Sequence, residues 1–189
     1  MTTVRFISDL HLGHKQICEF SGKHRGNVKT VEEHDAWIIE QWNSVVSKRD
    51  LVIVLGDVAF TKPALALMKK LKGSKHLLKG NHDKWADAVY APYFDKILGF
   101  SKYKGAAWLS HAPIHPQELR GLVNIHGHTH QNVIRIAKTE ITDVQDVGHA
   151  YKMIERTEFA DDHRYFSVCP EALAGKPIAW EEIKKRVNL

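Results

Sequence analysis

The stretch His76-Leu77-Leu78-Lys79-Gly80-Asn81-His82-Asp83 decides the fold of this chain. Its first part is a short apolar run, typical of a buried strand, and its second part is a polar turn. The turn places the amide oxygen of Asn81 and the imidazole of His82 where the strand ends. A sheet holds side chains at its strand ends rigidly and leaves them open to solvent, so the stretch predicts a functional site at a sheet edge.

Four further stretches repeat this layout, each with Asp or His where an apolar run ends. The runs Val4 to Ser8 and Leu51 to Leu55 are typical of buried strands. Carboxylate, amide and imidazole donors suit divalent cations, so the five stretches together predict a metal site. Cys18 and Cys169 lie away from all five stretches in sequence, which excludes a Cys-x-x-Cys zinc site. The four stretches are Asp9-Leu10-His11, Gly56-Asp57, Ser110-His111 and Gly127-His128-Thr129-His130.

Helical patterns separate the first three strands. Thr30 to Ser47 opens with Thr30 and Glu33, which form a capping-box signature. A second helix is expected between Pro63, a residue that favours a helix start, and Gly73, which closes it. Strands that alternate with helices in this way indicate an α/β fold.

The chain of 189 residues is expected to form one domain, residues 1–189, that buries its own core. After His130 the periodic pattern weakens, and the polar segment 132–164 is interpreted as an insertion over or beside the site. A last strand near Tyr165 to Cys169 and a final helix over Ala179 to Val187 close the domain. Further short strands are expected at Lys96 to Phe100, Ala106 to Leu109 and Leu122 to Ile125.

The formal net charge is +5 and the isoelectric point is near 9.1, which favours contact with anions. The 22 acidic residues are mixed among the 27 basic ones, so the chain carries no basic tail. No apolar segment is long enough for a signal peptide or a membrane span. A cytoplasmic, reducing location without a membrane partner is therefore expected, and the sequence leaves the oligomeric state open.

The order of the five stretches resembles that of the calcineurin-like metallophosphoesterases: Asp-x-His, Gly-Asp, Gly-Asn-His-Asp/Glu, His, Gly-His-x-His. The resemblance runs from Val4 to His130 by motif. It implies a four-layer α/β/β/α sandwich of two mixed sheets flanked by helices. It also implies two divalent metal ions at the carboxyl ends of the strands, with manganese expected first and iron, zinc, nickel or cobalt as alternatives.

The same resemblance implies seven metal ligands. Two cations about 3.5 to 4 Å apart repel each other and need a shared anionic ligand, which suits one bridging carboxylate. His128 and His130, one residue apart, would point to the same side of an extended segment and reach adjacent metals. The implied ligands are Asp9, His11 and His130 for one ion, Asn81, His111 and His128 for the other, and Asp57 as the bridge.

His82 resembles the family histidine that stands over the substrate phosphate and protonates the leaving oxygen. A cationic imidazole is an effective general acid near neutral pH, and Asp83 beside it is expected to orient the ring. One departure from the family pattern concerns Phe60, because many relatives carry an Asp three residues after the bridging one. This change is expected to affect the shape of the substrate side.

Three residues after the first motif are candidate substrate contacts, namely His14, His24 and Arg25. They belong to a basic stretch that would steer an anionic phosphoester toward the metals. The alternative for such residues is a solvated surface.

The leading hypothesis is therefore metal-dependent hydrolysis of a phosphoester, favouring a small-molecule or nucleotide phosphodiester, by a metal-bridging hydroxide with a histidine general acid. A nuclease acting on DNA or RNA is one alternative, motivated by the basic balance. A non-catalytic scaffold on the same fold is another, against which the intact ligand motifs argue. Sequence motifs fix the reaction centre and leave the substrate open.

Overall fold

The computed structural model describes residues 2–146 and 151–189. A five-stranded sheet in the order β11-β1-β2-β3-β4 forms its first layer of strands. The pairs β1–β2, β2–β3 and β3–β4 are parallel and β11 is antiparallel, so the sheet is mixed. The parallel strands bring the carboxyl ends of β1, β2 and β3 to one edge. The strands are β1 (Val4–Ile7), β2 (Leu51–Val54), β3 (Ser74–Leu78), β4 (Lys96–Leu98) and β11 (Ile178–Ala179).

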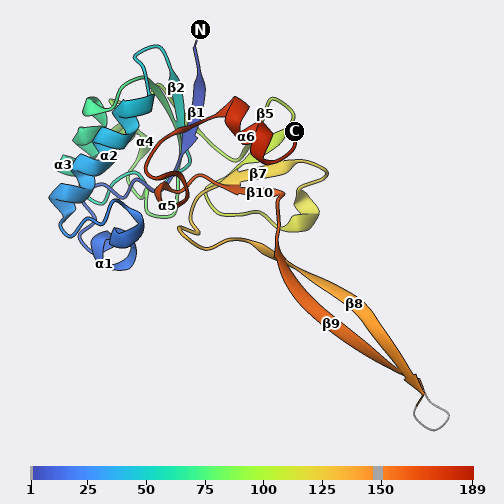
Figure 1. Ribbon diagram of the computed structural model, residues 1–189. Coiled ribbons are helices and arrows are strands. Elements are labelled where there is room, and N and C mark those ends of the chain that lie inside the picture. The colour runs from blue at the N-terminus through green and yellow to red at the C-terminus, as the bar shows by residue number, and fades with distance from the viewer. Residues whose placement is uncertain (1, 147–150) are drawn as a thin grey trace. The chain divides into compact units, whose positions relative to one another are not determined.

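Helices cover one face of this sheet, as Figure 1 shows for α2, α3 and α4. The capping box predicted at Thr30 and Glu33 is present at the start of α2. Ile38 and Trp42 of α2 pack against Val52 and Val54 of β2 in a buried apolar cluster. The helical elements of this layer are α2 (Val31–Val45), α3 (Lys62–Leu65), the 3-10 helix η2 (Ala66–Lys70) and α4 (Asp87–Tyr90).

A four-stranded sheet in the order β10-β7-β6-β5 packs against the other face. A second buried cluster joins Phe6 and Ile53 of the first sheet to Leu109 and Ile125 of the second. This sheet is also mixed, because only β5 is antiparallel to its neighbour. Its strands are β5 (Ser101–Tyr103), β6 (Ala107–Leu109), β7 (Val123–His126) and β10 (Tyr165–Ser167).

Short helices complete the α/β architecture. Trp180 and Ile183 of α6 (Trp180–Arg186) belong to the cluster between the sheets. The indole of Trp108 on β6 donates a hydrogen bond to the carbonyl of Leu119, next to the 3-10 helix η3 (Pro116–Glu118). Two mixed sheets flanked by helices confirm the fold class expected from the sequence. The remaining short helices are α1 (Ile17–Ser21), η1 (Gly22–His24) and α5 (Pro170–Leu173).

Residues 133–163 form a compact unit separate from Met1–Asn132 and Arg164–Leu189. This unit is an antiparallel pair of long strands, β8 (Arg135–Asp146) and β9 (Tyr151–Asp161), with a register shift between Ile141 and Asp143. It coincides with the polar segment 132–164, of which residues 147–150 lie outside the described part. The sequence pattern gave no strand there, whereas pairing satisfies the backbone of both segments. Among the described residues, no helix has the length and apolar character needed to cross a membrane.

Candidate metal centre

The five polar stretches meet where strands of both sheets end. Asp9 follows β1, Asp57 follows β2 and Asn81 follows β3, while His111 and His128 follow β6 and β7 of the second sheet. Backbone hydrogen bonds join these loops, from Asp9 N to Gly56 O and from His11 N to Asp57 O. The parallel register of the strands is therefore what assembles the centre.

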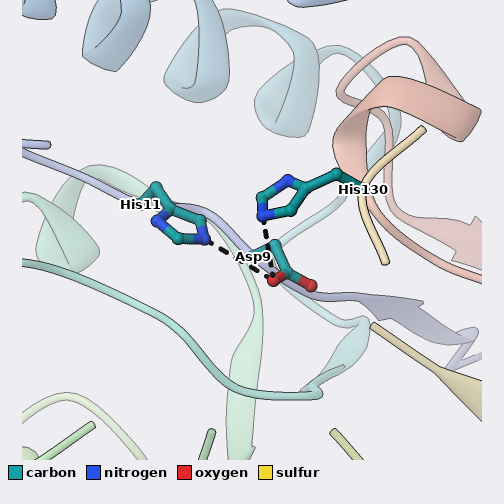
Figure 2. A group of neighbouring side chains, drawn as sticks. All are labelled: Asp9, His11 and His130. Atoms are coloured by element: carbon teal, nitrogen blue, oxygen red, sulfur yellow. Dashed lines mark ion pairs between the residues drawn. The ribbon is translucent and has the colours of Figure 1, made fainter. Parts of the chain in front are cut away.

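Asp9, His11 and His130 form one candidate ligand group, and Figure 2 shows an imidazole nitrogen of each histidine directed at the Asp9 carboxylate. His11 Nε2 lies 3.5 Å and His130 Nε2 lies 3.9 Å from Asp9 Oδ1. Asp9 Oδ1 and both ring nitrogens of His11 are buried and have no hydrogen-bond partner among the described residues. Buried polar atoms normally have a partner, so this donor set fits a divalent cation.

A second group surrounds Asp57. Its Oδ2 lies 3.3 Å from His111 Nε2 and 3.8 Å from His11 Nε2, so one carboxylate oxygen faces both halves of the centre. Asn81 Oδ1 lies 2.8 Å from His111 Nε2 and 3.1 Å from His128 Nδ1. All seven residues expected as ligands are thus together. Their assignment to two ions stays a prediction.

Five of these seven residues have left-handed backbone conformations. Residues other than glycine rarely adopt positive φ, and such strain gathers at functional sites where surrounding contacts enforce it. The geometry of the centre is therefore imposed on the loops by the fold. The φ angles are 48° at Asp9, 49° at His11, 56° at Asp57, 71° at His128 and 52° at His130.

Two glycines allow the loops to approach each other closely. A Cβ atom added at Gly80 would lie 2.3 Å from Asp57 Oδ1, and one added at Gly127 would lie 2.3 Å from Asp9 Oδ2. Neither distance is compatible with a side chain. The glycines before Asn81 and His128 therefore let those ligands reach the carboxylates of the first sheet.

The Asp9 carboxylate is held by a residue that the sequence analysis placed outside the site. Cys169 Sγ donates to Asp9 Oδ2 at 3.3 Å, and the backbone N–H of His128 donates to the same oxygen at 2.8 Å. Burial raises the pKa of the Cys169 thiol well above its usual value, so the thiol keeps its proton as a donor. With Oδ2 occupied, Oδ1 is the oxygen left facing His11 and His130.

The charges of the centre are tightly coupled. Burial alone would lower the pKa of His111, but a hydrogen bond with Asp57 and the charge of Asp9 raise it to about 9. Burial would raise the pKa of Asp9, yet contacts with His11 and His111 hold it well below its usual range. In the metal-free chain, protonated imidazole thus occupies the place of a cation, and metal binding must displace that proton.

His82 and Asp83 do not form the pair that the sequence suggested. Both Asp83 oxygens accept backbone hydrogen bonds, from Asp57 N at 2.7 Å, Val58 N at 3.1 Å and Gly80 N at 2.9 Å. Asp83 therefore fixes the loops after β2 and β3 and is not directed at the ring of His82. The His82 side chain is 40% exposed, and its Nε2 lies 4.0 Å from Asp57 Oδ2, within reach of a substrate over the centre.

Arg25 also differs from the expectation of a substrate contact. Its side chain is fully buried, its Nε donates to Glu171 Oε1 at 2.8 Å, and its Nη2 donates to the carbonyl of Asp9 at 2.9 Å. His130 Nδ1 lies 2.9 Å from the same Glu171 oxygen. Glu171 of α5, which the sequence analysis missed, therefore orients His130 so that Nε2 faces Asp9.

Replacing Glu171 by Gln is expected to weaken metal binding by about 10- to 100-fold, because the carboxylate that orients His130 and balances Arg25 loses its charge. Titration calorimetry of the metal-free chain with manganese measures this change. Glu181→Gln, at a 69% exposed side chain of α6, is the matched control and should bind as the wild type does. An unchanged Kd in folded Glu171→Gln protein would contradict the orienting role.

The Glu171 carboxylate also makes stability depend on pH. Burial alone would raise the pKa of Glu171, but the hydrogen bond with His130 and the charge of Arg25 lower it from 4.5 to about 2. As the pH falls, Glu171 is protonated in the unfolded chain before it is protonated in the folded one. Its contribution to the free energy of unfolding is therefore complete above pH 4.5 and is lost as the pH falls toward 2. Urea unfolding should give a higher free energy of unfolding for the wild type than for Glu171→Gln. This difference should be constant down to about pH 5 and should shrink at lower pH. A difference in the free energy of unfolding that grows as the pH is lowered would contradict this assignment to Glu171.

His14 and Phe60, also singled out in the sequence, line a pocket together with His11, His82 and His130. His14 is half-buried and stacks on Phe60, with ring centroids 3.8 Å apart and planes at 3°. The ring centroid of Phe60 lies 4.9 Å from that of His82, so Phe60 lies on the exposed side of the centre where His82 stands. His24 is exposed and lines a neighbouring pocket.

This fold, with carboxylates and imidazoles gathered at the strand ends, defines a metal-binding hydrolase centre. The family model of the calcineurin-like phosphoesterases matches residues 2–181, and the chain belongs to that family. Gene 66 protein of Mycobacterium phage L5 is 33% identical over 170 residues, covering 71% of this chain and 80% of the phage protein. An uncharacterized protein of Methanocaldococcus jannaschii is 32% identical over 138 residues, covering 70% and 72%. The crystal structure of the protein of unknown function AQ665 from Aquifex aeolicus is similar with a TM-score of 0.67 and 26% identity, covering 98% and 99%.

Proposed function

We propose that the chain is a dinuclear metal-dependent phosphodiesterase that acts on a small-molecule or nucleotide diester. The observation that carries the proposal is the position of Asp57 Oδ2, which faces His111 at 3.3 Å and His11 at 3.8 Å. One carboxylate oxygen between two donor sets is what a pair of cations requires. The family, whose members hydrolyse phosphoesters, supports the reaction type.

Bound divalent cations would supply the Lewis-acid charge for the phosphoryl oxygens and make a water nucleophilic at neutral pH. Asp9, His11 and His130 would hold one ion, and Asn81, His111 and His128 the other, with Asp57 shared. His82 stands at the exposed side of the centre and would give a proton to the departing oxygen. Asp57 Oδ1 accepts the backbone N–H of His82 at 2.9 Å, which keeps the shared carboxylate and the proton donor in one geometry.

Metal removal tests this function directly. Hydrolysis of bis(p-nitrophenyl) phosphate should be lost after treatment with a chelator and should return on addition of manganese. Iron, zinc, nickel and cobalt are compared in the same assay, and metal analysis should find about two ions per chain. A chain that stays free of metal and never cleaves the diester would indicate a scaffold. Activity that survives complete metal removal would exclude the proposed mechanism.

A further inference from the structure

A pocket of about 530 Å³ lies beside the centre, and His11, His82 and His130 are among the residues that line it. We name it the neutral pocket. Pockets of about 300 to 1,000 Å³ hold ligands of the size of a nucleoside or larger. Because His82 is the proton donor of the proposed function, a group in this pocket would sit on the leaving side of the scissile bond.

The lining of the neutral pocket lacks charged side chains of the Lys, Arg, Asp and Glu types among the described residues. A second phosphate there would find no Lys or Arg side chain to pair with, which is unfavourable for a buried or half-buried anion. Aromatic faces and amide groups instead suit a planar, uncharged group with polar edges, such as a nucleobase. These side chains are Ile17, Phe20 and Phe60 on the apolar side, and Gln16, Gln131 and Asn132 among the carboxamides.

A second pocket of about 570 Å³ shares Phe20 with the first, and Phe20 is 64% exposed. We name it the basic pocket, because Lys15, Lys23 and Lys29 line it with one acid, Glu19. All three lysines are exposed. Clustered ammonium groups beside an exposed aromatic ring are typical of grooves that follow the backbone of a single nucleic-acid strand.

We propose that the centre and the two pockets bind consecutive groups of a short single-stranded oligonucleotide. The scissile phosphate would lie at the centre formed by Asp9, Asp57 and their histidines, the leaving nucleoside would stack in the neutral pocket at Phe20, and the next phosphate would pair with Lys23 and Lys29. This inference rests on the proposed phosphodiesterase function and names its substrate class. The alternation of a charged centre, a neutral pocket and a basic pocket matches the alternation of phosphate and nucleoside.

The reaction consumes one water. Its oxygen forms the new bond to phosphorus, the bond from phosphorus to the nucleoside oxygen breaks, and His82 gives its proton to that oxygen. The proton lost by the water restores the charge of His82, so no further reactant is needed. The products are a phosphomonoester and a free hydroxyl on the departing strand.

Steady-state kinetics on the manganese-loaded chain test the proposal with a thymidine dinucleotide, which has one phosphate, and a thymidine trinucleotide, which has two. The trinucleotide should be cleaved with a kcat/KM about tenfold higher, and the Lys23→Ala/Lys29→Ala variant should lose that preference. Phe20→Ala should lower kcat/KM for both by about tenfold. Lys185→Ala, at an exposed lysine of α6, is the control and should keep the preference.

Binding gives a readout that needs no turnover. Fluorescence anisotropy of a labelled trinucleotide should show affinity falling with salt, and each lysine removed should reduce the slope of log affinity against log salt by about 0.7. Equal cleavage of the two oligonucleotides, or equal salt slopes in wild type and lysine variant, would overturn the proposal. If bis(p-nitrophenyl) phosphate alone is hydrolysed, the oligonucleotide inference fails and the phosphodiesterase stands. If no ester is cleaved, the proposed function fails, and the anisotropy still decides whether the pockets bind a strand.

Discussion

The Asp57→Asn enzyme is expected to lose at least about 10³-fold in kcat/KM for bis(p-nitrophenyl) phosphate, or about 4 kcal/mol of transition-state stabilisation. Asp57 Oδ2 faces both donor sets, 3.3 Å from His111 Nε2 and 3.8 Å from His11 Nε2. An amide removes the negative charge that two neighbouring cations share. It also turns an N–H group toward the bound cations or, in the metal-free chain, toward the protonated imidazole of His111, both of which it repels.

Asn has nearly the same shape as Asp, and its oxygen can still accept the backbone N–H of His82. The variant should therefore fold, which circular dichroism and the Tm of the metal-free protein check. Asp87→Asn is the matched control, since Asp87, the first residue of α4, is 66% exposed and forms an ion pair with Lys79. Its kcat/KM should equal that of the wild type. Full activity of a folded Asp57→Asn enzyme would remove the shared carboxylate from the mechanism.

The site of this protein could be predicted where its signals are local. β1, β2 and β3 are each followed within three residues by a glycine or a polar residue that breaks the apolar pattern, so the sequence marks both the end of the strand and the donor. α2 begins at Val31, directly after the predicted cap Thr30, because capping is decided within one turn of helix. The family motifs then placed seven residues at one edge, and the structure brings them together.

The supporting residues could not be predicted in the same way. Glu171 lies 41 positions from His130 and 146 from Arg25, and a single glutamate on a four-residue helix carries no pattern. Arg25 stands in a stretch of lysines and histidine that is typical of a solvated surface, yet its guanidinium is buried. Cys169 was interpreted only as the end of a strand. Burial and pairing of these groups depend on contacts between distant segments, which local composition does not encode.

The strands in the segment between residues 132 and 164 also had no local signal. Its mixed charges and weak periodicity were interpreted as a polar insertion, with no strands predicted in it, and the described part forms β8 and β9. Two strands that pair only with each other need no continuous apolar face, so alternation is weak. Hydrogen bonding across the pair satisfies the backbone instead.

His82→Gln is expected to lower kcat by about 10²- to 10⁴-fold on a diester with an alkoxide leaving group, such as a thymidine dinucleotide. An alkoxide is a strong base and needs a proton as the P–O bond breaks, whereas p-nitrophenolate departs without one. The same variant should therefore lose much less on bis(p-nitrophenyl) phosphate. The His82 ring contacts Phe60 and is 40% exposed, so glutamine at this position should leave the fold intact.

The difference between the two leaving groups is the decisive measurement. A general acid predicts that the rate loss grows with the basicity of the leaving oxygen, so a series of aryl diesters should give a steeper dependence of log kcat on leaving-group pKa in His82→Gln than in the wild type. If His82 only oriented the phosphate, its replacement would lower kcat by the same factor on every ester. Parallel lines for the two enzymes would therefore assign the proton to another group, and Asp83, whose oxygens are taken up by the N–H groups of Asp57, Val58 and Gly80, is not available for that role.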